Sequence, residues 1–171
     1  MRKRSMAAVA AAATALLVPA LAATPASAAS SFHFLNEESW SCIVITSTAA
    51  NAQAHIKKCD TSTTAKRKQL TFQVKWGNHL VNAATGKCLD INLGKNKKLN
   101  SGDAVVTNTC KQTAANQKWS FTGDGVVTIE HIHRAREPYV FIAEAGTKNW
   151  SNVIVQTQGY PVPDRQIWHT R

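Results

Sequence analysis

The stretch that decides the fold reads LVNAATGKCLD at residues 80–90, and NQKW follows it at residues 116–119. The last part, Gln117-Lys118-Trp119, recurs as Gln166-Ile167-Trp168, 49 positions further on (166 − 117). Residues 69–71 (QLT) lie 48 positions before it (117 − 69), with threonine in the place of tryptophan. Recurrence at a nearly fixed interval indicates a repeat architecture. Residues 29–171 are therefore predicted to form three units of nearly equal length.

The segments between these motifs are short and β-rich. Runs of β-branched and aromatic residues alternate with turn formers such as WGN at residues 76–78 and TGDG at residues 122–125. No window from residue 30 to residue 171 shows a sustained helical period. This pattern predicts an all-β sandwich or barrel. We expect strands at residues 42–45, 70–74, 79–81, 104–107, 126–129, 139–142 and 153–155.

Residues 1–28 differ in composition from the rest of the chain. A basic start at residues 1–4 precedes an almost entirely apolar run at residues 6–23, and residues 26–28 (ASA) form a small-residue cleavage pattern. This order is that of a secretory signal peptide. Pro19 and the weakly apolar alanines argue against a permanent membrane span. We therefore expect a secreted, extracellular domain of residues 29–171, preceded by a signal peptide of residues 1–28.

All four cysteines, Cys42, Cys59, Cys88 and Cys110, lie in the expected secreted domain. An even number of cysteines in an exported chain indicates disulfides. A zinc site needs closely spaced pairs, and the spacings here are 17, 29 and 22 residues. Spacing alone leaves three connectivities open. The repeat period favours Cys42 with Cys59 and Cys88 with Cys110, one disulfide within each of the first two units.

The charge of the chain is strongly basic, with a formal net charge of +10. Lysine and arginine are spread evenly over the three units, with short clusters at residues 66–68 and 95–98 that we expect in solvated loops. A nucleic-acid reader gathers its basic residues on one face, so we expect no nucleic-acid partner. In a secreted protein, a basic surface would instead favour an anionic cell-surface polymer.

The stretch at residues 80–90, together with Cys110 and NQKW, resembles one subdomain of the ricin-B-type (Q-x-W) β-trefoil family of lectins and carbohydrate-binding modules. The resemblance extends by period over residues 29–171, and it is sharpest in the middle repeat. It implies an all-β β-trefoil with pseudo-threefold symmetry, a short barrel capped by hairpins. In its shared core we expect Trp119 and Trp168 to be buried, with Thr71 in the third equivalent position. Phe72 or Trp76 would then fill the volume that threonine leaves.

The resemblance also implies where a sugar would bind. In the middle repeat Asp90 matches the family's carboxylate, Asn116 its amide and Gln117 its Q-x-W glutamine. Asn108 stands where the family places an aromatic ring against the sugar, and Val106 stands at a further polar position. The outer repeats lack the set at the matching carboxylate and ring positions, which are Val44 and Lys57 in the first repeat and Ala143 and Thr157 in the third.

These features predict a non-catalytic, lectin-like protein with one weak carbohydrate site in the middle repeat. We expect a monomer that needs no cofactor and binds a glycan or polysaccharide of galactoside, xylan or arabinan type. No G-x-S-x-G motif is present, and the acidic residues identify no paired carboxylates of a glycosidase, so we expect no enzyme activity. The alternative is a β-trefoil that has lost sugar binding and acts through protein contacts, as an inhibitor or a toxin-associated subunit.

A metal site receives little support. His131 and His133 would lie two positions apart on one strand, but the sequence offers no evident third ligand. We therefore expect both to lie on a solvated edge of the sheet and predict no metal centre.

Overall fold

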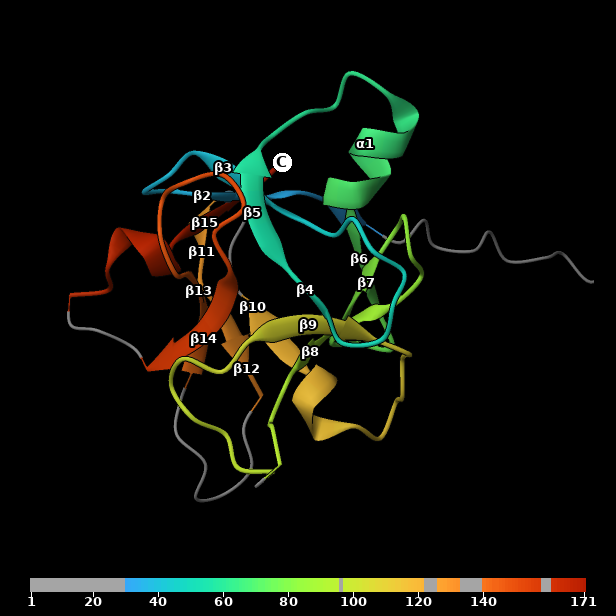
Figure 1. Cartoon of the computed structure of the whole chain (residues 1–171), viewed down its shortest axis with the longest axis vertical. Coiled ribbons are helices and arrows are strands. Elements are labelled where there is room, and N and C mark those ends of the chain that lie inside the picture. Colours follow the sequence, from blue (N-terminus) through green and yellow to red (C-terminus); the bar gives the residue numbers. More distant parts are fainter. Residues whose placement is uncertain (1–29, 96, 122–125, 133–139, 158–160) are drawn as a thin grey trace, which may run out of the picture.

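The computed structural model describes residues 30–95, 97–121, 126–132, 140–157 and 161–171, so the expected signal peptide lies outside the described residues. Within them the strands form three antiparallel sheets, shown in Figure 1. The first has the order β1 (Ser31–Phe32), β6 (Phe72–Lys75), β7 (His79–Asn82), β8 (Cys88–Ile91), β9 (Val105–Asn108), β4 (Ala52–Gln53). The second has the order β10 (Trp119–Phe121), β12 (Ile129–His131), β13 (Val140–Glu144), β14 (Val153–Thr157). The third has the order β11 (Val126–Val127), β15 (Trp168–Thr170), β2 (Phe34–Asn36), β3 (Ser41–Val44), β5 (His55–Lys58).

Strand pairing shows that the chain closes on itself through three equivalent contacts. A large ring at the end of each repeat pairs with a buried polar residue at the start of another. These pairs are Phe72 with Asn82, Trp119 with His131, and Trp168 with Asn36. The last pair joins the third repeat to the first, so the predicted all-β, three-repeat architecture is confirmed.

The polar partners hold the repeat junctions in the same way. Asn82 Nδ2 donates to the carbonyl of Gln69 at 3.0 Å, and Asn36 Nδ2 donates to the carbonyl of Arg165 at 3.0 Å. His131 Nε2 lies 2.9 Å from the carbonyl of Ala115. A buried carbonyl without a partner is costly, so these contacts specify where each repeat begins.

The ring at the third equivalent position is Phe72, so the expectation of Thr71 there is wrong, and the expectation that Phe72 fills this part of the core is confirmed. Phe72 is fully buried, whereas the Thr71 hydroxyl donates to the carbonyl of Arg67 at 2.8 Å. Trp76 does not fill the core, because it is 51% exposed. Leu70, not Gln69, precedes the ring by two residues and matches Gln117 and Gln166. The repeat match through Gln69 is therefore one residue out of register with the structure.

A short helix causes this shift. Helix α1 (Thr64–Leu70) stands where the other repeats have the 3-10 turns η1 (Ala115–Gln117) and η2 (Asp164–Gln166). The Thr63 hydroxyl caps its first turn by accepting from the Lys66 amide at 3.2 Å. Only Leu70 is buried among its seven residues, so no apolar period revealed the helix. Residues 66–68 therefore lie on a helix and not in the expected loop.

The core rings and the disulfides connect segments of the same repeat. Trp119 Nε1 donates to the carbonyl of Leu89, and Trp168 Nε1 donates to the carbonyl of Ile142, both at 3.1 Å. Both rings are buried as predicted, at 1% and 0% exposure. The structure also confirms the disulfides Cys42–Cys59 and Cys88–Cys110. In the described part of the chain, no helix is long and apolar enough to cross a membrane.

Candidate functional site

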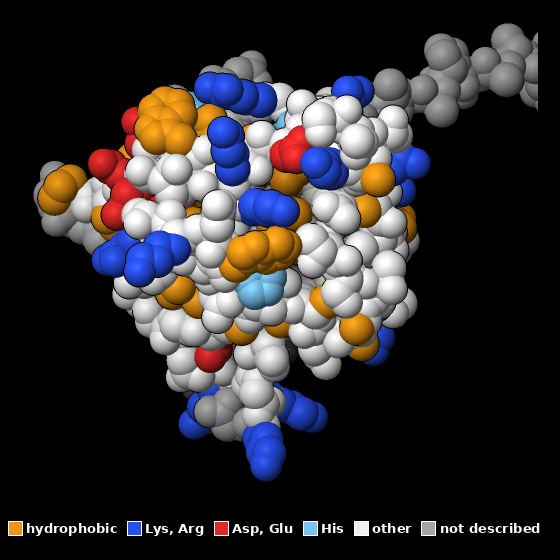
Figure 2. Space-filling view, turned by 45° about the horizontal axis from the view of Figure 1, so that its top comes forward, with side chains coloured by type: hydrophobic (Ala, Val, Ile, Leu, Met, Phe, Trp, Pro, Cys, Tyr) orange, Lys and Arg blue, Asp and Glu red, His pale blue; other side chains and the backbone are white. Residues whose placement is uncertain are grey.

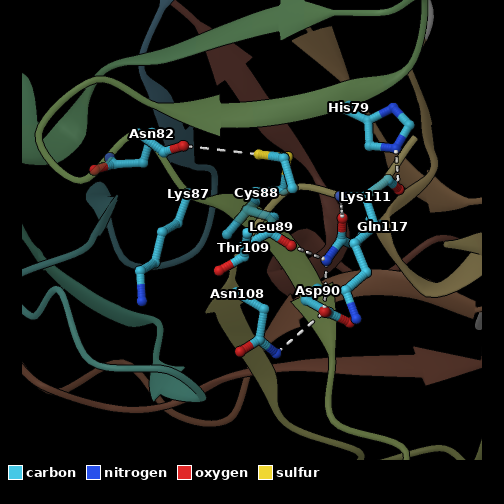
Figure 3. The surroundings of a disulfide bond; sticks show 12 residues. His79, Asn82, Lys87, Cys88, Leu89, Asp90, Asn108, Thr109, Lys111 and Gln117 are labelled. Atoms are coloured by element: carbon cyan, nitrogen blue, oxygen red, sulfur yellow. Dashed lines mark hydrogen bonds between the residues drawn. A yellow bond between two sulfur atoms is a disulfide. The ribbon is translucent and has the colours of Figure 1, made fainter. Parts of the chain in front are cut away.

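The four predicted ligand residues come together at one pocket on the middle repeat. Asp90 is on β8, Asn108 is on the neighbouring β9, and Asn116 and Gln117 come from η1. Figure 3 shows Asn108 and Gln117 directed toward the Asp90 carboxylate. The pocket has a volume of about 430 Å³. It is lined by Asn51, Asp90, Asn108, Thr109, Lys111, Ala114, Asn116 and Gln117.

Asp90 is the centre of this polar cluster. Its Oδ2 atom accepts from Gln117 Nε2 at 2.9 Å and from Asn108 Nδ2 at 3.1 Å, and its Oδ1 atom accepts from Asn116 Nδ2. Burial raises the pKa of Asp90 above its ordinary value, and the bonds from Gln117 and Asn108 partly offset the rise. The Ile91 backbone amide also lowers the pKa of Asp90, so amide groups surround the carboxylate and a ligand hydroxyl would share its lone pairs with them.

Gln117 also has a structural role. Its Oε1 atom accepts from the Lys111 amide at 2.8 Å, and its Nε2 atom donates to the carbonyl of Thr109 at 3.0 Å as well as to Asp90. These bonds tie the segment after β9 to η1. The same side chain therefore satisfies buried backbone groups and orients the carboxylate.

Asn51 is a pocket residue that the sequence did not reveal. Its Oδ1 atom accepts from Asn108 Nδ2 at 2.9 Å, and its backbone amide donates to Asn108 Oδ1 at 2.9 Å. Asn51 belongs to the first repeat and reaches the pocket because β4 pairs with β9, with Ala52 opposite Thr107. Its φ of 55° is a conformation that asparagine tolerates better than most residues. That preference was the only local signal.

The outer repeats have no carboxylate at the position of Asp90. Pairing of the strands places Val44 and Ala143 there, both buried, as expected. The ring position of the first repeat is Lys57, which lies opposite Cys42 as Asn108 lies opposite Cys88.

In the third repeat, the ring position needs a correction. Gln156 lies opposite Phe141, the residue that matches Cys88, so Gln156 occupies this position and Thr157 does not. The third repeat therefore also lacks an aromatic ring there.

The expectation that His131 lies on a solvated edge of the sheet is wrong. His131 is 2% exposed, and its contact with the Ala115 carbonyl makes it part of the repeat junction. His133 lies outside the described residues. No group of three or more potential metal ligands occurs among the residues that the structure describes.

The sequence profile of the ricin-type β-trefoil lectin domain matches residues 76–171, which is more than half of the chain. The chain belongs to the ricin-type β-trefoil lectin domain family. The profile covers the middle and third repeats, and the strand pairing described above extends the same repeat to the first. A comparison with curated proteins gives no match.

Solved structures share the fold of this ricin-type domain. The designed threefold-symmetric protein ThreeFoil has a TM-score of 0.63 and 19% identity, over 82% of this chain and 96% of its own. The ricin B-like lectin of Macrolepiota procera, solved with lactose, has a TM-score of 0.63 and 15% identity, over 86% and 98% of the two chains.

An exo-β-1,3-galactanase of Clostridium thermocellum has a TM-score of 0.67 and 20% identity, over 85% of this chain but 30% of its own. At such low identities, these likenesses show the β-trefoil fold alone.

Proposed function

We propose that this protein is a secreted, non-catalytic carbohydrate-binding domain with a single weak site in the middle repeat. The observation that carries the proposal is the buried Asp90 carboxylate, oriented by three side-chain amides at the pocket. Sugar hydroxyls donate to such a carboxylate in fixed directions. Because the donors already hold the carboxylate in place, little ordering is needed when a ligand binds.

The pocket offers little apolar contact to a sugar ring. Asn108, bonded to both Asp90 and Asn51, stands where a stacking aromatic would supply that contact. Hydrogen bonds to sugar hydroxyls replace bonds to water, so their net contribution is small. A polar site without a ring should bind with a dissociation constant nearer about 1 mM than 1 μM, or about −4 against −8 kcal/mol.

Avidity within one chain should not increase this affinity. Val44 and Ala143 replace the carboxylate in the outer repeats, so a monomer presents this type of site once. We propose neutral glycans of galactoside, xylan or arabinan type as ligands of the Asp90 site. The lectin relative solved with lactose supports this class by family likeness alone.

The test is a calorimetric or NMR titration of mature protein with galactosides, xylans and arabinans. Asp90→Ala should abolish binding, and Asn108→Trp should strengthen it by restoring a stacking surface. Asp164→Ala is the matched control, because it removes an exposed carboxylate at η2 and leaves the pocket intact.

Binding that survives Asp90→Ala would place the site elsewhere. No binding to any glycan, together with no gain from Asn108→Trp, would overturn the proposal in favour of action through protein contacts.

A further inference from the structure

Three exposed tryptophans, Trp40, Trp76 and Trp150, have backbones in the left-handed region, and two of them, Trp40 and Trp150, lie beside basic side chains. Trp40 is 58% exposed with φ 54°, and Trp150 is 48% exposed with φ 69°. For a bulky residue this conformation is unfavourable. Exposure and backbone conformation alone do not mark a ligand site, because Trp76 has both; the basic side chains beside Trp40 and Trp150 distinguish these two rings.

Trp40 occupies a position where the middle repeat has glycine. Trp40 and Gly86 each lie two positions before the first cysteine of their repeat (42 − 40 and 88 − 86). Their amides make the same bond, from Trp40 to the Asn36 carbonyl at 3.0 Å and from Gly86 to the Asn82 carbonyl at 2.8 Å. The turn itself therefore does not require tryptophan.

Trp150 is held in place by the first repeat. Its amide donates to the Ile56 carbonyl at 2.8 Å, and its carbonyl lies 3.1 Å from Nδ1 of His55. The His55 ring meets the indole edge-on, and Lys57 Nζ lies 4.7 Å from the indole centroid. The ring is thus a fixed platform with a cation beside one face.

Two pockets with shared lining residues lie beside Trp40 and beside Asn149, the residue before Trp150. A pocket beside Trp40 is lined by Trp40, His33, Lys58, Cys59, Thr61 and Arg171, among others. A second pocket, beside Asn149, is lined by Lys57, Lys58, Cys59, Asp60, Thr61 and Ser62 as well. The two share Lys58, Cys59 and Thr61, and Asn149 adjoins Trp150. We refer to the surface formed by Trp40, Lys57, Lys58, Arg171 and Trp150 as the Trp40–Trp150 face.

This face is positively charged. Within the described residues, no carboxylate side chain forms an ion pair with Lys57, Lys58 or Arg171. The nearby Asp60 is paired with Lys66 at 2.7 Å, and Glu37 is bonded to His169. Figure 2 turns the top of Figure 1, which includes β5, toward the viewer, and shows basic side chains between large hydrophobic ones on this side of the molecule.

We propose that the Trp40–Trp150 face is a second binding surface, for a glycan chain whose sugars carry carboxylate groups. An indole ring offers a flat surface to the C–H face of a sugar. A neutral sugar that stacked on the face of Trp150 beside Lys57 would displace the ammonium group and offer it no new partner. A sugar carboxylate pairs with the displaced ammonium, so acidic sugars are favoured over neutral ones.

This surface is separate from the Asp90 pocket. The proposal rests on the proposed function only in that its ligand is also a glycan. The probes are an oligogalacturonate and the same oligomer with its carboxylates methyl-esterified, titrated into the mature protein. Esterification should weaken binding at least about tenfold, equivalent to 1.4 kcal/mol. Indole N–H signals of Trp40 and Trp150 should shift on binding, while those of the buried Trp119 and Trp168 should not.

The variants locate the binding on this face. Lys57→Gln/Lys58→Gln and, separately, Trp150→Ala should each weaken oligogalacturonate binding about tenfold or more. Lys95→Gln/Lys97→Gln removes the same charge from a different loop, and Trp76→Ala removes another exposed indole. Both controls should leave the affinity within about twofold. Asp90→Ala should also leave it unchanged, which separates this proposal from the function proposed for the middle repeat.

Three results would overturn the proposal. The first is equal affinity for the esterified and free oligomers. The second is an equal loss in the Lys95/Lys97 control, which would show attraction to net charge alone. The third is tighter binding of single-stranded DNA or of vesicles of anionic phospholipid at matched charge, which would assign the face to another class of partner.

Discussion

The middle and third repeats have the same frame and different sites. In both, a buried tryptophan donates to a strand carbonyl at 3.1 Å, and a glutamine two positions earlier ends a 3-10 turn. The middle repeat has Asp90 where the third has Ala143. The frame therefore depends on backbone bonds and core rings, whereas the candidate site depends on single side chains that the frame tolerates.

The two glutamines show the same contrast. Gln117 bonds to Asp90, to the Thr109 carbonyl and to the Lys111 amide. Gln166 Nε2 donates to the Thr157 carbonyl at 2.9 Å, but its Oε1 atom has no hydrogen-bond partner among the described residues. Each glutamine thus donates to a backbone carbonyl of its own repeat, and only Gln117 also orients a carboxylate.

The largest effect is expected where the frame is shared. Trp119→Ala and Trp168→Ala should each lower the free energy of unfolding by about 3–5 kcal/mol, because both remove a fully buried ring. Chemical denaturation of the two variants measures this. Phe72→Ala tests the corrected third position and should cost a similar amount, while Thr71→Ala should cost much less. A mild Phe72→Ala effect would contradict the assignment of three equivalent rings.

The disulfides distinguish the first two repeats from the third, where Phe141 stands in place of the first cysteine. Cys88→Ser/Cys110→Ser should lower the free energy of unfolding by about 3 kcal/mol, because the bond closes a loop of 22 residues. Equilibrium denaturation measures this loss. A titration of the same double variant with galactosides, xylans and arabinans shows whether binding changes as well. A loss of stability below about 1 kcal/mol would show that the middle repeat keeps its frame without a disulfide, as the third repeat does.

Glu144 in the third repeat contrasts with Asp90 in its lack of partners. Both oxygens of Glu144 are buried without a hydrogen bond among the described residues. Burial raises the pKa of Glu144, and the Glu38 carboxylate adds to the rise. The Ser39 hydroxyl opposes this rise only in part, and it forms no hydrogen bond of normal geometry with Glu144. The folded chain therefore holds this proton more tightly than the unfolded chain, and stability falls as pH rises above the ordinary glutamate value of about 4.5.

Glu144→Gln should accordingly stabilise the protein by about 1 kcal/mol at pH 7, since it removes a buried charge without partners. The gain should disappear below about pH 4, where the wild-type group is protonated in both states. Thermal denaturation across this range measures the difference. Asp90→Asn is the comparison variant and should give no such gain, because three amides already stabilise the Asp90 carboxylate. A stabilisation of Glu144→Gln that does not vary with pH would exclude the charge as its cause.

Local motifs explain why part of the site could be predicted. Asp90 and Gln117 belong to short sequence patterns whose spacing is fixed by β8, β9 and η1, so the sequence brought them together correctly. Asn51 could not be found, because only the long-range pairing of β4 with β9 places it there. The repeat pattern assigns the third ring position to Thr71, one residue before Phe72, because α1 replaces a 3-10 turn and the basic residues of α1 hide its helical pattern. The exposure of Trp40 and Trp150 depends on tertiary contacts that the local sequence does not specify.

The smallest effect concerns the equivalent turns that contain Trp40 in the first repeat and Gly86 in the middle repeat. Gly86→Ala should lower the free energy of unfolding by about 1 kcal/mol, because its φ of 66° is unfavourable for alanine. Steric clash does not contribute, since an added Cβ meets nothing within 4 Å. The reverse change, Trp40→Gly, relieves the same strain but loses the stacking of the indole on His169, where the ring centroids lie 5.9 Å apart. The greater entropy of glycine in the unfolded chain opposes the relief.

These opposing terms should leave Trp40→Gly within about 1 kcal/mol of the wild type, as measured by chemical denaturation. Oligogalacturonate binding by the same variant should fall, because the indole that bounds the Trp40–Trp150 face is removed. A ring kept for stability would give the opposite pattern, with a loss above about 2 kcal/mol and unchanged binding. A single substitution, measured in both assays, thus tells whether the first repeat departs from the glycine of the middle repeat for the sake of its fold or for the sake of a ligand.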